Sequence, residues 1–156
     1  MLILASASAA RRNLLDQAGI SYKAMVSGVN EEEIAHYDPR ELVKILAEAK
    51  AKAVSTKLLA LQGGVSWPDE ITLVLGCDSV FEFDGEVYGK PLNANQAIER
   101  LEKISNSKGL LHTGHFLLSK RYKGSQNFEE VPLAWLSAVV TTEVNFSDIT
   151  KLEIKK

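Results

Sequence analysis

The sequence has few residues that form disulfides or bind zinc: its 156 residues include one cysteine and three histidines. The single thiol, Cys77, cannot form a disulfide within the chain and lacks the partners of a zinc knuckle, which favours a reducing compartment. His36, His112 and His115 have no cysteine or second carboxylate at ligand spacing, so they do not predict a zinc site. We therefore expect a cytoplasmic protein without a structural zinc ion.

A large excess of charge of either sign is also lacking. Eighteen lysines and arginines stand against twenty aspartates and glutamates, which gives a formal net charge of −2. A broad basic surface of the kind used for nonspecific nucleic-acid binding is therefore excluded. We expect no nucleic-acid partner, although a local basic pocket is compatible with this composition.

Long apolar runs are absent as well. The longest, residues 71–77 and the interrupted run 131–140, fall far short of the roughly 20 residues of a membrane helix. No basic region precedes the short apolar run 2–7, so it does not predict a signal peptide. We expect no membrane segment and, at 46% hydrophobic and 24% charged residues, one globular domain over residues 1–156.

Apolar runs of strand length alternate with helical patterns, which predicts an α/β protein. Asp38 caps a helix that begins at Pro39, and Asp84-Gly85 is a hairpin turn between residues 81–83 and 86–88. The predicted strands are residues 2–5, 22–27, 71–75, 110–119 and 133–146, the predicted helices are residues 8–19, 39–61, 95–105 and 147–156, and residues 121–130 form a loop.

Hydroxyls and arginines gather between the first strand and the first helix. Ser6 and Ser8 precede Arg11 and Arg12 where free backbone N–H groups and the helix dipole favour an anion, phosphate above all. The alternative is that Ser8 only caps the helix while both arginines are solvated. The paired arginines favour the phosphate interpretation.

Lys50 stands on the apolar stripe of the long helix, among Val43, Leu46, Ala47 and Val54. Its ammonium either reaches solvent at the edge of the helix or meets a buried anion. Both interpretations are open from the sequence alone.

Asp78 and Lys90 follow the most apolar strand. Asp78 lies after Gly76 at the carboxyl end of that strand, where open α/β sheets present catalytic carboxylates or metal ligands, although an aspartate of a turn is the alternative. Lys90, in Gly89-Lys90-Pro91, is either presented to a ligand or exposed in a turn. Cys77, without a basic neighbour, is expected to be a packed small residue.

Taken in order, these residues resemble the Maf family of nucleoside triphosphate pyrophosphatases, once called septum formation inhibitors. The resemblance rests on several ordered motifs along most of the chain: residues 2–8 with Arg11, residues 27–31, residues 46–51, residues 76–80, 84–87 and 89–91, and residues 112–114.

The resemblance implies an elongated, inosine-triphosphatase-like (Maf/Ham) α/β fold: a mixed sheet flanked by helices, with a nucleotide cleft. It implies a hydrolase that converts a nucleoside triphosphate, or its deoxy form, to the monophosphate and pyrophosphate with Mg²⁺ or Mn²⁺, limiting non-standard or surplus nucleotides. It also suggests a homodimer. The alternatives are a nucleotide-binding regulator of cell division with little turnover, or a structural α/β domain whose charges are solvated.

The resemblance also assigns roles to residues. Arg11, Lys50 and Lys90 become ligands of the triphosphate, with Ser6 and Ser8 beside them. Asp78 becomes the catalytic base or a metal-bound carboxylate, and Glu31 becomes a second metal-site residue.

The chain departs from the family pattern at several positions. Ala9 replaces a proline, and Ala10 and Ser79 occupy two positions associated with base choice, so neither known specificity pattern transfers. Asn30 replaces an aspartate beside Glu31. Family members continue past the helix expected after Ser147 into a further lobe, so we expect that lobe to be incomplete here.

Overall fold

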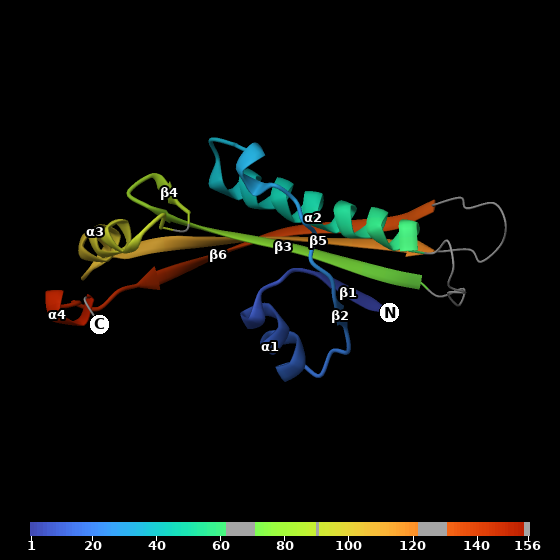
Figure 1. Cartoon of the computed structure of the whole chain (residues 1–156), viewed down its shortest axis with the longest axis horizontal. Coiled ribbons are helices and arrows are strands. Elements are labelled where there is room, and N and C mark those ends of the chain that lie inside the picture. Colours follow the sequence, from blue (N-terminus) through green and yellow to red (C-terminus); the bar gives the residue numbers. More distant parts are fainter. Residues whose placement is uncertain (62–70, 90, 122–130, 155–156) are drawn as a thin grey trace.

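The computed structural model describes residues 1–61, 71–89, 91–121 and 131–154. Its central element is a mixed six-stranded sheet in the order β2-β1-β3-β5-β6, with β4 beside β3. The strands are β1 (Leu2–Ala5), β2 (Lys23–Ala24), β3 (Ile71–Phe83), β4 (Glu86–Tyr88), β5 (Lys108–Arg121) and β6 (Val131–Asn145). Strand β1 pairs in parallel with β2 and β3, whereas β3, β5 and β6 are antiparallel. The predicted mixed sheet flanked by helices is confirmed (Figure 1).

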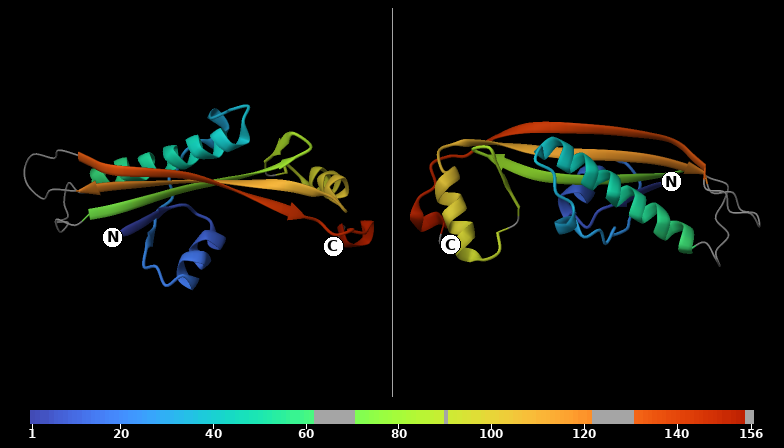
Figure 2. Two further views of the ribbon diagram at one scale, coloured as in Figure 1. Left: turned by 180° about the vertical axis from the view of Figure 1, so that it is seen from behind. Right: turned by 90° about the horizontal axis from the view of Figure 1, so that it is seen from above.

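Helix α2 (Pro39–Leu61) covers one face of the sheet, and helix α1 (Ala9–Gln17) lies on the other (Figures 1 and 2). Val43, Ala47 and Val54 recur at helical spacing and are buried against the strands. The helix approaches β3 closely because Gly76 has no side chain: a Cβ there would lie 2.0 Å from the Ala47 carbonyl oxygen. Tight packing of α2 on β3 therefore fixes the residues that follow Gly76.

The remaining elements lie toward one end of the sheet, with β4 (Figure 1). They are helices α3 (Ala94–Ile104) and α4 (Lys151–Ile154); the short 3₁₀ helix η1 (Glu31–Glu33) precedes α2 in the chain. The predicted hairpin is confirmed, since β4 pairs with the end of β3 and both turn residues, Asp84 and Gly85, have positive φ, 52° and 76°. Among the described helices, none is long and apolar enough to span a membrane.

Three predicted boundaries are wrong. The strand expected to end at residue 75 continues to Phe83, because β5 pairs with it along nearly its whole length and β4 along its last residues. The strand expected at residues 22–27 is only Lys23–Ala24. The last helix begins at Lys151, where Thr150 and Glu153 form a capping box, and Ser147 does not cap it. Most of the loop predicted at residues 121–130 lies outside the described residues.

Candidate functional site

The candidate site lies on an open stretch of the β3 edge. Strand β1 pairs with β3 as far as Gly76, and β4 begins to pair at Phe81. Between them, within the described part of the chain, residues 77–80 have β5 on one edge and no strand on the other. Because successive side chains of a strand point to opposite faces, Asp78 reaches the α2 side and Ser79 the α1 side.

On the α2 side, a buried lysine joins two carboxylates. The Lys50 ammonium is 2.5 Å from Asp78 Oδ1 and 2.8 Å from Glu31 Oε1. Lys50 and Asp78 are buried, whereas the Glu31 side chain, on η1, is 55% exposed. Of the two interpretations left open for Lys50, the structure shows the buried anion.

The loop that carries Glu31 is held by a second lysine of the same helix. Lys57 donates a hydrogen bond of 3.1 Å to the Val26 carbonyl, two residues before Gly28, whose φ is +70°. The hydroxyl of buried Ser27 accepts from the Val29 N–H at 3.5 Å. Glu31 therefore reaches Lys50 from a loop that is hydrogen-bonded to the same helix.

On the α1 side, Arg11 connects its own helix to the loop before α1 and to β3. Its guanidinium donates to Ser6 Oγ at 3.1 Å, to the Cys77 carbonyl at 2.9 Å and to Ser79 Oγ at 3.0 Å. The Ser79 hydroxyl is also 3.0 Å from Thr113 Oγ1 on β5. Arg11 can donate to the Cys77 carbonyl because, among the described residues, no strand pairs with this edge of β3 between β1 and β4.

The other predicted site residues differ in what they do. Ser8 caps α1, since its hydroxyl accepts from the Arg11 N–H at 3.4 Å, while its own N–H donates to Ser6 Oγ at 3.2 Å. Ala10 is exposed on the first turn of the helix. Lys90 lies outside the described residues. Two groups are thus brought together, Lys50–Asp78–Glu31 and Ser6–Arg11–Ser79.

The electrostatics of the site affect two further side chains on β3 and β5. Burial raises the pKa of the Cys77 thiol, while Arg11 and Lys50 lower it by less. Burial, with a smaller effect of the Arg11 cation, lowers the pKa of His115, which pairs with Cys77 across the strands. The thiol is therefore kept protonated as a packed group, as the sequence predicts.

Sequence reasoning missed two contributors to the site. The sequence marks Thr113 only as part of a motif, and its contact with Ser79 depends on the register that sets the two residues opposite each other. The Cys77 carbonyl is a backbone group, so the residue type at this position does not indicate that it accepts a hydrogen bond from Arg11. The run Gly76-Cys77-Asp78-Ser79 is the one signal that points to this stretch.

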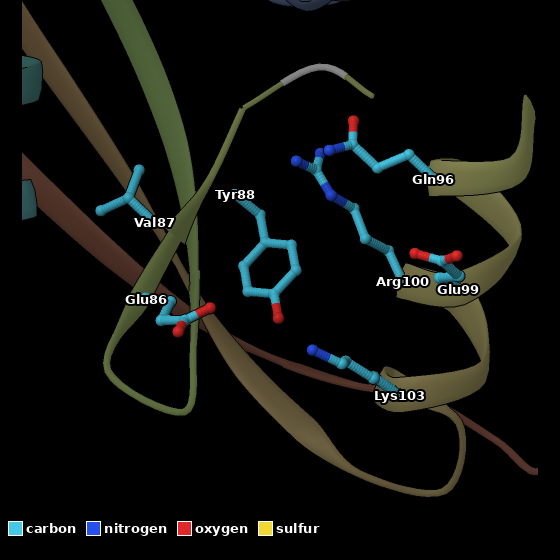
Figure 3. Close-up of a pocket in the computed structure, with 7 residues that line it drawn as sticks. All are labelled: Glu86, Val87, Tyr88, Gln96, Glu99, Arg100 and Lys103. Atoms are coloured by element: carbon cyan, nitrogen blue, oxygen red, sulfur yellow. The ribbon is translucent and has the colours of Figure 1, made fainter. Parts of the chain in front are cut away.

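A separate pocket lies between β4 and α3 (Figure 3). Arg100, Lys103 and Gln96 point from the helix toward Tyr88, with Glu86 on the strand side. The Arg100 guanidinium lies 5.1 Å from the centre of the Tyr88 ring and donates to the Gly89 carbonyl at 2.6 Å. Arg100 therefore holds the backbone immediately before Lys90.

The donor set of the site suits a divalent cation shared with phosphates. No cluster of three or more histidine, cysteine, aspartate or glutamate side chains occurs in the described ranges. Asp78 and Glu31 nevertheless converge on Lys50, and Mg²⁺ is commonly held by one or two carboxylates together with substrate phosphates. The two carboxylates thus fit Mg²⁺ or Mn²⁺ in that shared mode.

Comparison with known proteins relates the whole chain to one family. The family described as Maf-like protein matches residues 1–156. A nucleoside triphosphate pyrophosphatase of Synechococcus sp. (strain CC9311) is 43% identical over 155 residues, which cover 99% of this chain and 75% of that protein. Proteins of the same name from Synechococcus sp. (strain CC9605) and Prochlorococcus marinus (strain MIT 9303) are 46% and 49% identical, over 98% and 99% of this chain and 74% and 72% of their own lengths.

Proposed function

Because the chain belongs to the Maf-like protein family, we propose that its site hydrolyses a nucleoside triphosphate, in the ribo or deoxy form, to the monophosphate and pyrophosphate. The relatives confirm the prediction of a nucleoside triphosphate pyrophosphatase, a hydrolase of acid anhydrides. The proposal places this activity in the cytoplasm, in keeping with a chain whose single cysteine is buried and unpaired.

The observation that carries the proposal is the pair of cations that flank Asp78. Lys50 approaches from α2 and Arg11 from α1, on opposite sides of one open strand edge. A triphosphate needs several cations to offset its charge, and a carboxylate among them can hold a water. This arrangement supports the hydrolysis of a phosphoanhydride better than a purely structural role, in which the charges would be solvated.

In the proposed reaction, Asp78 orients a water and accepts its proton. The water attacks the α-phosphorus in line, and the bond between that phosphorus and the oxygen bridging to the β-phosphorus breaks, so that pyrophosphate leaves. Arg11, Lys50 and Lys90, with the Ser6 and Ser8 hydroxyls, bind the phosphate oxygens. A divalent cation on Asp78 and Glu31 would offset the charge of the phosphates as the bond breaks.

Base choice is proposed to depend on Ala10 and Ser79. Ala10 is small and exposed on α1, so it leaves space rather than making a hydrogen bond. The Ser79 hydroxyl is held by Arg11 and Thr113, which fixes the direction in which it presents its remaining hydrogen-bonding capacity. Both residues lie beside the proposed phosphate ligands in sequence or in space.

The test is release of pyrophosphate from a panel of standard, methylated and deaminated nucleoside triphosphates with Mg²⁺ or Mn²⁺. We expect Asp78→Asn to lower turnover about 100-fold or more, because the amide cannot accept a proton from water. Asp84→Asn is the matched control, since Asp84 has a φ of 52° in the hairpin turn, a conformation that asparagine tolerates. Nucleotide binding without pyrophosphate release by the wild type would instead favour the regulator.

A further inference from the structure

We propose that the Lys50 ammonium is the resident counter-cation of Asp78 and Glu31, and that a divalent cation binds these carboxylates only together with the nucleotide. The phosphate oxygens of the nucleotide then bind the Lys50 ammonium, which leaves the carboxylate oxygens available to the divalent cation. This inference rests on the proposed function for its nucleotide step, whereas its first half concerns the nucleotide-free protein alone.

The geometry places the ammonium where a metal would have to bind. Lys50 Nζ is within hydrogen-bond distance of one oxygen of each carboxylate, 2.5 Å from Asp78 and 2.8 Å from Glu31. Two of these three residues are buried, so water does little to screen the pair. A cation on the same two oxygens would face the ammonium directly.

The charges argue against a metal ion without nucleotide. The two carboxylates and the ammonium together carry one negative charge, so a divalent cation would leave the cluster positive. Like charges a few ångströms apart in a partly buried site repel each other strongly, because little water screens them. With Lys50 in place, half of the carboxylate charge is already offset, and one oxygen of each carboxylate is paired with the ammonium.

A triphosphate changes this balance. Its oxygens offer the ammonium new acceptors and bring enough negative charge to accommodate both cations. The lysine stem has four methylene groups, so the ammonium can leave the carboxylates without any movement of α2, whose packing against Gly76 and Gly114 fixes the backbone. Lys50 therefore couples phosphate binding to the release of the carboxylate oxygens that would bind the metal.

The first experiment measures Mn²⁺ binding to the nucleotide-free protein by the electron paramagnetic resonance signal of free Mn²⁺. We expect Lys50→Met to bind Mn²⁺ about tenfold more tightly, or better, than the wild type, because the repelling charge is gone. Lys52→Met is the matched control on the same helix, where the exposed ammonium pairs with Glu48 at 2.7 Å, and its affinity should equal that of the wild type. Equal affinities of folded Lys50→Met and wild type would overturn the inference.

A second variant covers the case in which Lys50→Met does not fold. The Glu31 side chain is half exposed, so Glu31→Gln removes a carboxylate while the buried Lys50–Asp78 ion pair is kept. If Lys50 occupies the carboxylates, nucleotide-free Mn²⁺ binding is equally weak in the wild type and in Glu31→Gln. Submillimolar binding by the wild type that weakens about tenfold or more in Glu31→Gln would show a preformed metal site and overturn the inference.

The nucleotide step is tested with an α,β-methylene triphosphate, which cannot be cleaved at the proposed bond. We expect its affinity for the wild type to rise with Mn²⁺ and this gain to shrink in Glu31→Gln. Equal affinity with and without Mn²⁺ would overturn the coupling alone. Failure of the analogue to bind under either condition would instead overturn the proposed function, and the comparison without nucleotide would still decide the role of Lys50.

Discussion

Arg11 and Ser79, 68 residues apart in the chain, are joined by a hydrogen bond of 3.0 Å across the end of β1. The same guanidinium holds Ser6 and the Cys77 carbonyl, so it ties the loop before α1 to the middle of β3. A charged donor that already has three protein acceptors is well oriented, and it keeps its positive charge available to an anion. Arg11 thus connects the segments that form the candidate site and places a positive charge there.

Arg11→Ala should weaken nucleotide binding more than it slows the bond-breaking step. Loss of a charge-assisted contact to phosphate is expected to raise KM about tenfold or more, with a smaller fall in kcat. Steady-state rates of pyrophosphate release measure both constants. Arg12→Ala serves as the neighbouring control, because that guanidinium is exposed and donates to the Ala7 carbonyl at 3.4 Å. Equal changes in the two variants would contradict a specific role for Arg11.

His115 should titrate below the ordinary range of histidine. Burial lowers its pKa first and the Arg11 cation lowers it further, so the folded state favours the neutral ring. Its contribution to stability is therefore present above the unfolded pKa and is lost as the pH falls through the folded pKa. Ring C–H chemical shifts followed against pH should give a midpoint below about 6.5 that rises in Arg11→Ala. A midpoint that does not move in Arg11→Ala would show that the cation does not act on the ring.

The fold could be predicted where the signals are local. The long helix is predicted at its observed bounds because Asp38 and Pro39 mark its start and its apolar stripe continues over many turns. The length of β3 could not be predicted, because Gly76 and Asp78 weaken a strand locally and are kept in it by pairing with β5. Distant residues in the sequence thus decide where this strand ends.

The site was predictable as a set of residues and not as a geometry. The sequence indicates Ser6, Arg11, Lys50 and Asp78 through their positions after strands and on the apolar stripe. It does not show that Lys50 lies between two carboxylates, because Glu31 comes from a loop whose path depends on Lys57. The local arguments identify charged groups, and only the tertiary contacts identify their partners.

Thr141→Val should destabilise the protein by about 1 kcal/mol, because it leaves a buried histidine nitrogen without its partner. His112 is 3% exposed; its Nε2 is 2.8 Å from Glu82 and its Nδ1 is 2.9 Å from the Thr141 hydroxyl. Valine keeps the shape and the strand preference of threonine, so the change isolates the hydroxyl. Urea unfolding gives the free energy, and Thr142→Val, exposed on the opposite face of β6, should leave it unchanged. A loss of equal size in both variants would indicate a general effect on the strand.

Gly76→Ala should be the most disruptive single-methyl change near the site. The added Cβ would lie 2.0 Å from the Ala47 carbonyl oxygen and 2.9 Å from the Ala51 nitrogen, both backbone atoms that cannot turn aside. Either α2 lifts from the sheet or β3 shifts, and overpacking of this kind is expected to lower the free energy of unfolding by about 3 kcal/mol. Gly89→Ala is the control, because a Cβ there meets no atom within 4 Å. Asp78 follows two residues after Gly76 and Lys50 lies on the displaced helix, so the folded fraction should also lose pyrophosphatase activity beyond its loss of stability. Unfolding curves of Gly76→Ala and Gly89→Ala that coincide would refute the close approach of α2 to β3.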